Sequence, residues 1–347
     1  MKKFQISNSW IGEGCPCYIV AEIGTGYQTF DEAKNLIDAA IEIGIDAIKF
    51  QTFEADTITT KNNFIDMEET GKISQYDLFK KLEIPKKIQK QIVSYANEKG
   101  ITVFSAPSHL NDISFLKELD LPVYKIGSDL ACHIPLLKEI AKLQKPLILS
   151  TGMCTVDEIR NSVDAIKSVG NDQIILLHCV SDYPAKIEDS NLNAILKMKE
   201  EFNLPVGFSD HSIGTLIPLT AVTMGANMIE KHFRDSANTP SPDDVHSLTK
   251  NEFAELIESI RNVEKARGSG VKQPVQAETK NMTTNRVSII ASQNIPKNSV
   301  ISIEQLDIRR PGTGIPPKFF DSIIGKKTKR DICKDEPIHF EDIEDLL

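Results

Sequence analysis

The stretch "PLILSTGMCTVDEIRNSVDAIKSVGNDQIILLHC" (146–179) contains one complete strand–helix–strand unit. The apolar runs at 146–151 and 173–179 are short and β-branched, which is typical of buried strands. Between them, Thr155 and Glu158 have the spacing of a helix capping box, and Gly170 is suited to end the helix. The stretch therefore predicts two parallel strands joined by a crossover helix.

The same alternation recurs from residue 18 to residue 267. Further strands are predicted at 18–23, 46–51, 101–106, 122–128, 205–210 and 227–233. Helical patterns lie between them, for example at 30–44, 84–100 and 250–266. These repeats predict an α/β fold, a (β/α)₈ or TIM barrel over residues 1–267. An open doubly wound sheet is the alternative, but no glycine-rich dinucleotide turn follows the first strand.

The chain changes character after residue 267. Residues 268–284 form a polar segment without periodicity, which we interpret as a linker, and residues 285–347 are predicted to be a small β-rich domain. Within that domain, 295–307 resembles 332–344, which indicates a weak internal repeat. Because so short a domain buries little core alone, we expect it to pack on the barrel or on a partner subunit.

Composition narrows the class of protein. The net charge of −9 argues against a general binder of nucleic acid or of anionic membranes. The six cysteines lack the spacing of a disulfide scaffold, and no apolar run approaches the length of a membrane span. No apolar segment of a secretory signal follows the N-terminus. We expect a reduced, cytoplasmic protein.

Polar side chains end several of the predicted strands, where a TIM barrel builds its active site. Three strands end in pairs spaced by two residues, which places both members on one face. These pairs are Lys49 with Gln51, Ser209 with His211, and Glu230 with His232. Further polar residues predicted at the same rim are Lys125, Ser128, Ser150, Thr151, Ser181 and Tyr183.

The histidines and lysines each allow two interpretations. His211 and His232, on adjacent strands, suit a shared divalent metal, or each is a hydrogen-bonded core histidine. Lys49 and Lys125 lie in apolar runs, where an unpaired ammonium is costly to bury. An anionic ligand with phosphate and carboxylate groups would satisfy them, and internal ion pairs with Glu22 or Glu230 are the alternative.

The motifs "AEIG" (21–24), "IKFQT" (48–52), "YKIGS" (124–128), "GFSDH" (207–211) and "RRPGTGIPP" (309–317), with "ILSTGM" and "EKHF" between them, resemble the N-acetylneuraminate (sialic acid) synthase family. The resemblance runs from about residue 15 to the end. It implies a TIM barrel followed by a C-terminal β-clip (SAF, antifreeze-like) domain, in a domain-swapped homodimer.

The resemblance also implies a transferase. Such an enzyme condenses phosphoenolpyruvate with open-chain N-acetylmannosamine or a related acetamido sugar, releases phosphate and forms a nine-carbon 2-keto acid. A legionaminate or pseudaminate synthase that uses a 2,4-diacetamido hexose is the alternative. A binding protein built around the C-terminal domain is a third interpretation, which needs neither paired histidines nor buried lysines.

Roles for individual residues follow from the resemblance. It implies catalytic roles for Glu22, Lys49 and Lys125, and a Mn²⁺ or Mg²⁺ site at His211 and His232. It also implies substrate contacts by eight residues: Gln51, Ser128, Ser150, Ser181, Tyr183, Ser209, Asp243 and Arg310. Ala106 and Leu130 depart from the family pattern, so the sequence leaves the acceptor sugar open.

Overall fold

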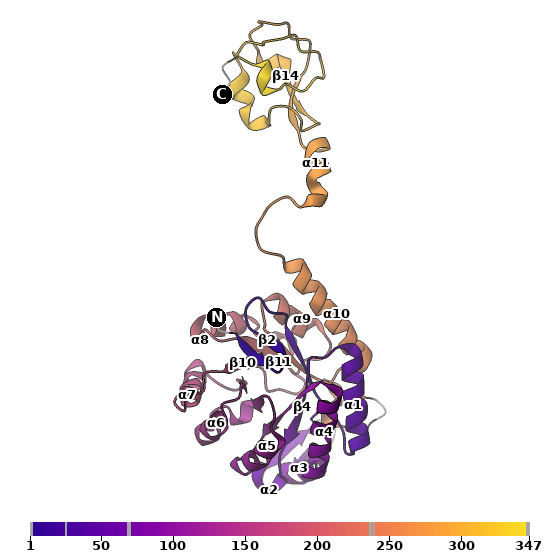
Figure 1. Cartoon of the computed structure of the whole chain (residues 1–347), viewed down its shortest axis with the longest axis vertical. Helices are drawn as coiled ribbons and strands as arrows, with labels where there is room; N and C mark the ends of the chain where they lie inside the picture. Colours follow the sequence, from indigo (N-terminus) through magenta and orange to yellow (C-terminus); the bar gives the residue numbers. More distant parts are fainter. Residues whose placement is uncertain (1–2, 25, 68–70, 236–237, 239, 345–347) are drawn as a thin grey trace. The chain divides into compact units, whose positions relative to one another are not determined.

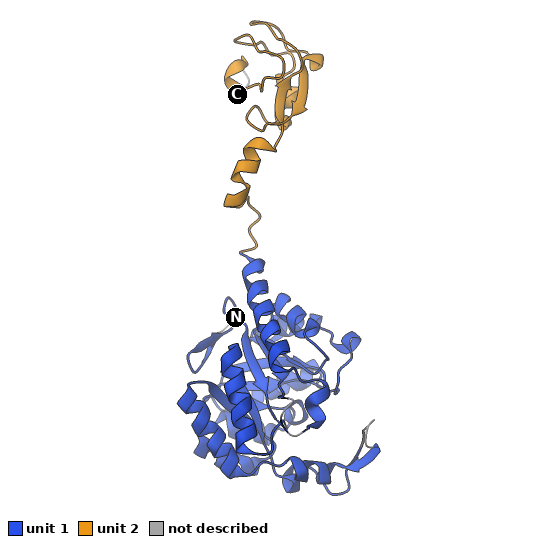
Figure 2. Ribbon diagram, turned by 90° about the vertical axis from the view of Figure 1, so that its right-hand side faces the viewer, with its two compact units in different colours: residues 1–268 blue, residues 269–347 orange. Residues whose placement is uncertain are grey.

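The computed structural model describes residues 3–24, 26–67, 71–235, 238 and 240–344. The chain divides into two compact units, residues 1–268 and 269–347 (Figure 2).

The first unit is built on a closed parallel barrel, as the sequence predicts. Eight strands follow one another around it in chain order, and the last pairs with the first. They are β3 (Tyr18–Glu22), β4 (Ala47–Thr52), β7 (Thr102–Pro107), β8 (Tyr124–Ile126), β9 (Leu147–Ser150), β10 (Ile174–Cys179), β11 (Val206–Asp210) and β12 (Met228–His232). The TIM-barrel prediction is confirmed.

Helices surround the barrel strands (Figure 1). They are α1 (Phe30–Ile43), α4 (Lys86–Lys99), α5 (Ile113–Leu119), α6 (Ile134–Ala141), α7 (Val156–Lys167), α8 (Asn193–Phe202), α9 (Leu216–Thr223) and α10 (Lys250–Arg267). The capping box of α7 forms, with the Glu158 amide donating to Thr155 Oγ1 over 3.3 Å. This helix ends at a cap on Ser168, two residues before Gly170, which instead adopts a left-handed turn conformation at φ 83°.

The barrel unit also contains smaller elements. The strand–helix alternation does not predict two hairpins and two short helices. The hairpins are β1 (Phe4–Ile6) with β2 (Ser9–Ile11) and β5 (Phe64–Met67) with β6 (Gly71–Ser74), and the helices are α2 (Ala55–Ile58) and α3 (Gln75–Leu82). Short 3₁₀ helices occur at η1 (Leu110–Asp112), η2 (Ser128–Leu130), η3 (Ile187–Asp189) and η4 (Pro242–Val245).

The described residues of the second unit form an antiparallel ladder, β13 (Ser288–Ala291) with β14 (Leu306–Arg309), and enclose an apolar core of their own. The predicted repeat is visible in its backbone. Ile295 and Ile332, which begin the two copies, donate amide hydrogen bonds to each other's carbonyls over 2.8 and 2.9 Å. Asn298 and Asp335, three residues further on, both have positive φ, at 61° and 68°. The two copies therefore form equivalent turns that pair at their starts.

Helical segments complete this unit. They are η5 (Gln276–Glu278), α11 (Thr279–Thr284), η6 (Ile303–Gln305), η7 (Pro317–Phe319), α12 (Phe320–Ile323) and η8 (Phe340–Asp342). The segment 268–284 is thus not irregular throughout, because its last nine residues are helical. All six cysteines are free thiols, and no helix among the described residues combines the length and apolarity needed to cross a membrane.

Candidate active site at the carboxyl ends of the barrel strands

A buried carboxylate, Glu230 near the end of β12, lies at the centre of the barrel mouth. Its Oε1 accepts hydrogen bonds from Lys49 Nζ at 3.0 Å, Lys125 Nζ at 3.2 Å and Ser209 Oγ at 3.1 Å. The donors come from β4, β8 and β11, so barrel closure brings together residues up to 181 positions apart in sequence. Burial opposes the ionisation of Glu230, but the two ammonium groups outweigh it and lower its pKa to about 2.

Glu22, at the end of β3, forms a second ion pair with Lys49, with Oε2 and Nζ 2.5 Å apart. Its other oxygen accepts a hydrogen bond from Gln51 Nε2 at 3.4 Å. Burial lowers the pKa of Lys49 to about 8, although Glu230 opposes the shift. Both lysines therefore have protein carboxylates as partners, which was the alternative to an anionic ligand. With two ammonium groups and two carboxylates, the cluster is formally neutral.

Three serines lie beside this cluster: Ser150 at the end of β9, Ser128 at the start of η2 and Ser181 in the loop after β10. Ser128 Oγ accepts a hydrogen bond from the Gly152 amide at 2.9 Å. Ser150 Oγ and Ser181 Oγ are buried and have no hydrogen-bond partner among the described residues. A Cβ atom at Gly152 would collide with Ser181 Oγ and lie 2.9 Å from Ser128 Oγ, so glycine is required for this close approach. The arrangement is a compact group of hydroxyl donors with unused hydrogen-bonding capacity.

The two predicted metal ligands lie close together. The ring centroids of His211 and His232 are 5.6 Å apart. Nδ1 of His211 donates a hydrogen bond to the Val180 carbonyl at 2.8 Å, which leaves Nε2 with a free lone pair. Burial lowers the pKa of His211 to about 4 and that of His232 well below its ordinary value, so both rings are neutral at pH 7. Neutral imidazole is the form that binds metal ions.

A third histidine, His246, lies beside His211 and His232. The pattern of polar residues at strand ends did not predict it. His246, in the loop after β12, has its ring centroid 4.6 Å from that of His232. Asp243 lies between them, with Oδ2 3.6 Å from His232 Nδ1 and Oδ1 3.8 Å from His246 Nε2. One ligand atom from each of His232, Asp243 and His246 lies within 4.8 Å of the others. The spacing Asp243-x-x-His246 was the signal available in the sequence.

Tyr183 and Arg310 complete the positions named from the sequence. The Tyr183 ring lies against the histidines, with its centroid 4.2 Å from that of His211 and 5.4 Å from that of His246. Arg310 follows β14 in the second unit and is exposed. The contacts form two groups at the barrel mouth, one of Glu22, Lys49, Gln51, Lys125, Ser209 and Glu230 and the other of His211, His232, Asp243 and Tyr183. Thr151 Oγ1 instead donates to the Leu177 carbonyl at 2.9 Å, and Arg310 lies in the other unit.

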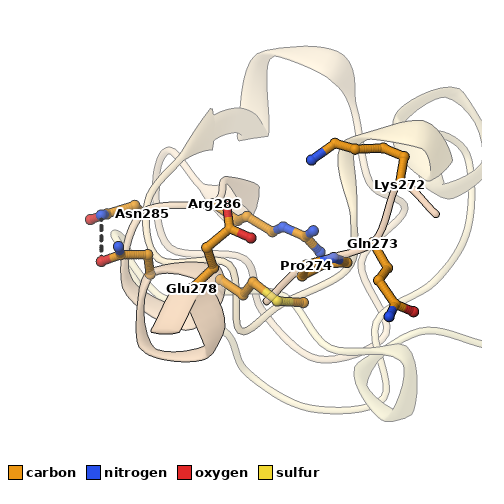
Figure 3. Close-up of a pocket in the computed structure, with 8 residues that line it drawn as sticks. Lys272, Gln273, Pro274, Glu278, Asn285 and Arg286 are labelled. Carbon is orange, nitrogen blue, oxygen red and sulfur yellow. Dashed lines mark hydrogen bonds between the residues drawn. The ribbon is translucent and has the colours of Figure 1, made fainter. Parts of the chain in front are cut away.

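A separate hollow of about 420 Å³ lies in the second unit, beside α11 (Figure 3). Nearly all of its lining side chains are exposed. The residues around it are Lys272, Gln273, Pro274, Glu278, Asn281, Met282, Asn285 and Arg286. None of these residues is a buried ionisable group, so the barrel mouth is the better candidate for chemistry.

Comparison with known proteins identifies the family of this chain. The model of the NeuB family matches residues 36–272, and that of the SAF domain matches residues 286–344. The chain is 38% identical to an N,N'-diacetyllegionaminic acid synthase of Legionella pneumophila, over 96% of each chain. It is 38% identical to a pseudaminic acid synthase of Campylobacter jejuni, over 91% of this chain and 93% of that one. The structure also resembles an N-acetylneuraminic acid (sialic acid) synthetase from Leptospira borgpetersenii solved with citrate, with a TM-score of 0.73 and 32% identity over 81% of this chain and 95% of that one.

Proposed function

The chain belongs to the NeuB family, and we propose that it is a synthase that condenses phosphoenolpyruvate with an open-chain acetamido sugar. The products are a nine-carbon 2-keto acid and phosphate. The resemblance to the sialic acid synthase family that the sequence indicates is confirmed. The observation that carries the proposal is the pair of lysines held by Glu22 and Glu230 beside the group of serine hydroxyls.

Two acceptor sugars are candidates. N-acetylmannosamine is the acceptor expected from the sialic acid synthase resemblance. A 2,4-diacetamido hexose is favoured by two named relatives, because one legionaminic and one pseudaminic acid synthase are 38% identical. The N-acetylneuraminate-9-phosphate synthase of Mus musculus and a pseudaminic acid synthase of Helicobacter pylori are each 32% identical. Leu130, whose position departs from the family pattern, packs half-buried against the barrel core.

The chain's own residues have clear tasks in this reaction. Lys49 and Lys125 present ammonium groups to the phosphate and carboxylate of phosphoenolpyruvate. Ser128, Ser150 and Ser209 add hydroxyl donors, while Gln51 and Glu22 lie together at the ends of β4 and β3. Glu22 orients or activates the water that attacks C2 of the substrate.

A divalent metal fits the histidines of the mouth. The imidazoles of His211 and His232 are buried and neutral, which is the form that binds a divalent ion. His211 and His232 would hold Mn²⁺ or Mg²⁺. When bound, the ion supplies a Lewis acid for the aldehyde of the acceptor sugar. Tyr183 and Ser181 would contact the sugar.

A homodimer is supported by the apolar rim of the barrel mouth. Exposed large apolar side chains are concentrated on the segments that follow β9, β10, β11 and β12, and such a patch is typical of an interaction surface. These residues are Met153, Tyr183, Ile187, Ile213, Leu216 and Val245. We propose that the partner's C-terminal unit covers this rim and contributes Arg310 of the partner subunit to the N-acetyl group. The free cysteines fit a cytoplasmic location.

Phosphate release tests the function. The full-length protein is assayed with phosphoenolpyruvate and Mn²⁺ against N-acetylmannosamine and a 2,4-diacetamido hexose. Release with either sugar supports the synthase, and the preferred sugar decides between the two candidates. His211→Ala should lose both activity and its dependence on added metal. No release with any acetamido hexose, from protein shown to be folded by circular dichroism, would contradict the proposal.

A further inference from the structure

We propose that Asp243 and His246 complete the metal site of His211 and His232, and that this set selects a divalent transition metal over Mg²⁺. The inference rests on the proposed function for the presence of a metal. It adds two ligands that the strand ends do not supply, and it assigns Asp243 to the metal instead of to the sugar.

The distances support a shared ion. Two atoms bound to one ion at ~2.1 Å are roughly 3 to 4 Å apart. The Asp243 carboxylate meets this with both neighbours, at 3.6 Å from His232 Nδ1 and 3.8 Å from His246 Nε2. Both separations are too long for hydrogen bonds, so direct bonding between these groups does not account for the cluster.

His246 has a buried ring nitrogen without a hydrogen-bond partner among the described residues. The nitrogen is Nε2, and the side chain is 1% exposed. Buried polar atoms are nearly always bonded, because an unbonded one loses its interaction with water without replacement. A metal ion between His232, Asp243 and His246 satisfies this atom.

The backbone sets this geometry without help from an ion. Asp243 and His246 are three residues apart around η4, and residues so spaced share one side of a 3₁₀ turn. The turn is started by Ser241, whose Oγ accepts from the Asp243 amide at 3.2 Å. The loop is then fixed to the barrel, because the Leu248 amide donates to the His232 carbonyl at 2.9 Å. The two added ligands are thus held beside the strand end that carries His232.

Ligand chemistry gives the selectivity. Imidazole nitrogens suit transition metals such as Fe²⁺, Ni²⁺ and Zn²⁺. Mn²⁺ also binds oxygen ligands, but it accepts imidazole nitrogens more readily than Mg²⁺, which favours oxygen ligands and keeps several waters. A site with His211 and His232 alone would leave most positions to water and substrate. The imidazoles of His232 and His246 and the carboxylate of Asp243 lie within 4.8 Å of one another, and with His211 beside them such a site should bind Mn²⁺ much more tightly than Mg²⁺.

The test measures metal binding without substrates. Full-length protein is stripped with a chelator and titrated with Mn²⁺, and the free ion is followed by electron paramagnetic resonance with and without excess Mg²⁺. We expect His246→Asn to weaken Mn²⁺ binding by at least about 10-fold and to let Mg²⁺ compete more effectively. The matched control is His109→Asn. His109 Nδ1 accepts a hydrogen bond from the Asn111 amide, and an asparagine side chain can accept the same bond.

Unchanged Mn²⁺ affinity and unchanged Mg²⁺ competition in folded His246→Asn would overturn the inference. Asp243→Asn serves as a second variant, with the same expectation, if the first does not fold. The Co²⁺ absorption spectrum should also change in either variant, because the ligand set changes. Absence of phosphate release by the wild-type protein would contradict the proposed synthase function but would not change the metal-binding results. Failure of the proposed function can therefore be distinguished from failure of the proposed metal site.

Discussion

Lys49 lies at the mouth of the barrel, and its surroundings there shift the pKa of its ammonium group. Its ammonium faces Glu22 on β3 and Glu230 on β12, with Lys125 on β8 and Cys179 on β10 nearby. Because the lysines and carboxylates already balance, phosphoenolpyruvate would bring uncompensated negative charge into a buried site. A divalent metal held by the nearby histidines would supply positive charge to offset it.

Phosphoenolpyruvate binding should therefore weaken at alkaline pH. Below a pKa of about 8 the Lys49 ammonium is charged and attracts the substrate, and as pH rises through that value the charge is lost. We expect the Kd for phosphoenolpyruvate, measured by calorimetry, to rise by up to about tenfold per pH unit above that pKa. Lys49→Arg, whose guanidinium stays charged, should bind without this alkaline loss. The same loss in the arginine variant would assign the titration to another group.

At the scale of elements, site residues lie on the loops that follow the strands, and each loop leads into a helix that fixes its end. The loop after β9 carries Gly152 and leads into α7, whose start is fixed by Thr155 and Glu158. Thr155 Oγ1 donates to Glu158 Oε2 at 2.8 Å while accepting from the Glu158 amide. These backbone and side-chain hydrogen bonds from Thr155 lower the pKa of the Glu158 carboxyl.

Thr155→Ala removes this cap. We expect the free energy of unfolding of the barrel unit to fall by ~1 kcal/mol, as measured by urea denaturation followed by circular dichroism. The control is Thr223→Ala, an exposed threonine whose hydroxyl donates to the Leu219 carbonyl within α9. That change should stay within about 0.5 kcal/mol of the wild type. Equal effects of the two substitutions would argue that the capping box adds no stability.

At the scale of the whole molecule, the second unit has its own core and carries Arg310 directly after β14. The barrel unit exposes apolar side chains around its mouth. In the proposed dimer these two features meet across subunits, which would bury the apolar rim and deliver a guanidinium to the sugar.

Arg310→Ala should raise the KM for the acceptor sugar more than the KM for phosphoenolpyruvate. Arg309→Ala is the matched neighbour, because Arg309 pairs within its own unit with Asp307 at 2.9 Å and Asp335 at 2.7 Å. These are exposed ion pairs, so the control should leave both KM values near those of the wild type. Steady-state kinetics with both variants decides the matter. An unchanged sugar KM in Arg310→Ala would contradict the shared site, and a monomer in sedimentation would contradict the dimer.

The positions of the eight strands, to within two residues at each end, and the faces of the strands could be read from the sequence, because both depend on local periodicity. Alternation also places Asp210 and Lys231 on the opposite face from the site, where they form a buried pair at 2.7 Å. The extra hairpins and the end of α7 escaped this reasoning, since tertiary packing and turn geometry decide them.

The partners within the site were decided by the tertiary structure alone. The sequence determined that Lys49 and Lys125 are buried and need negative charge, and it named Glu22 and Glu230 without choosing between them. Barrel closure pairs Lys49 with both carboxylates and Lys125 with Glu230, because the register of β12 against β11 and β3 fixes where each strand ends. His246 joined the histidines for the same reason: its loop is anchored to the end of β12, a contact that no local pattern encodes.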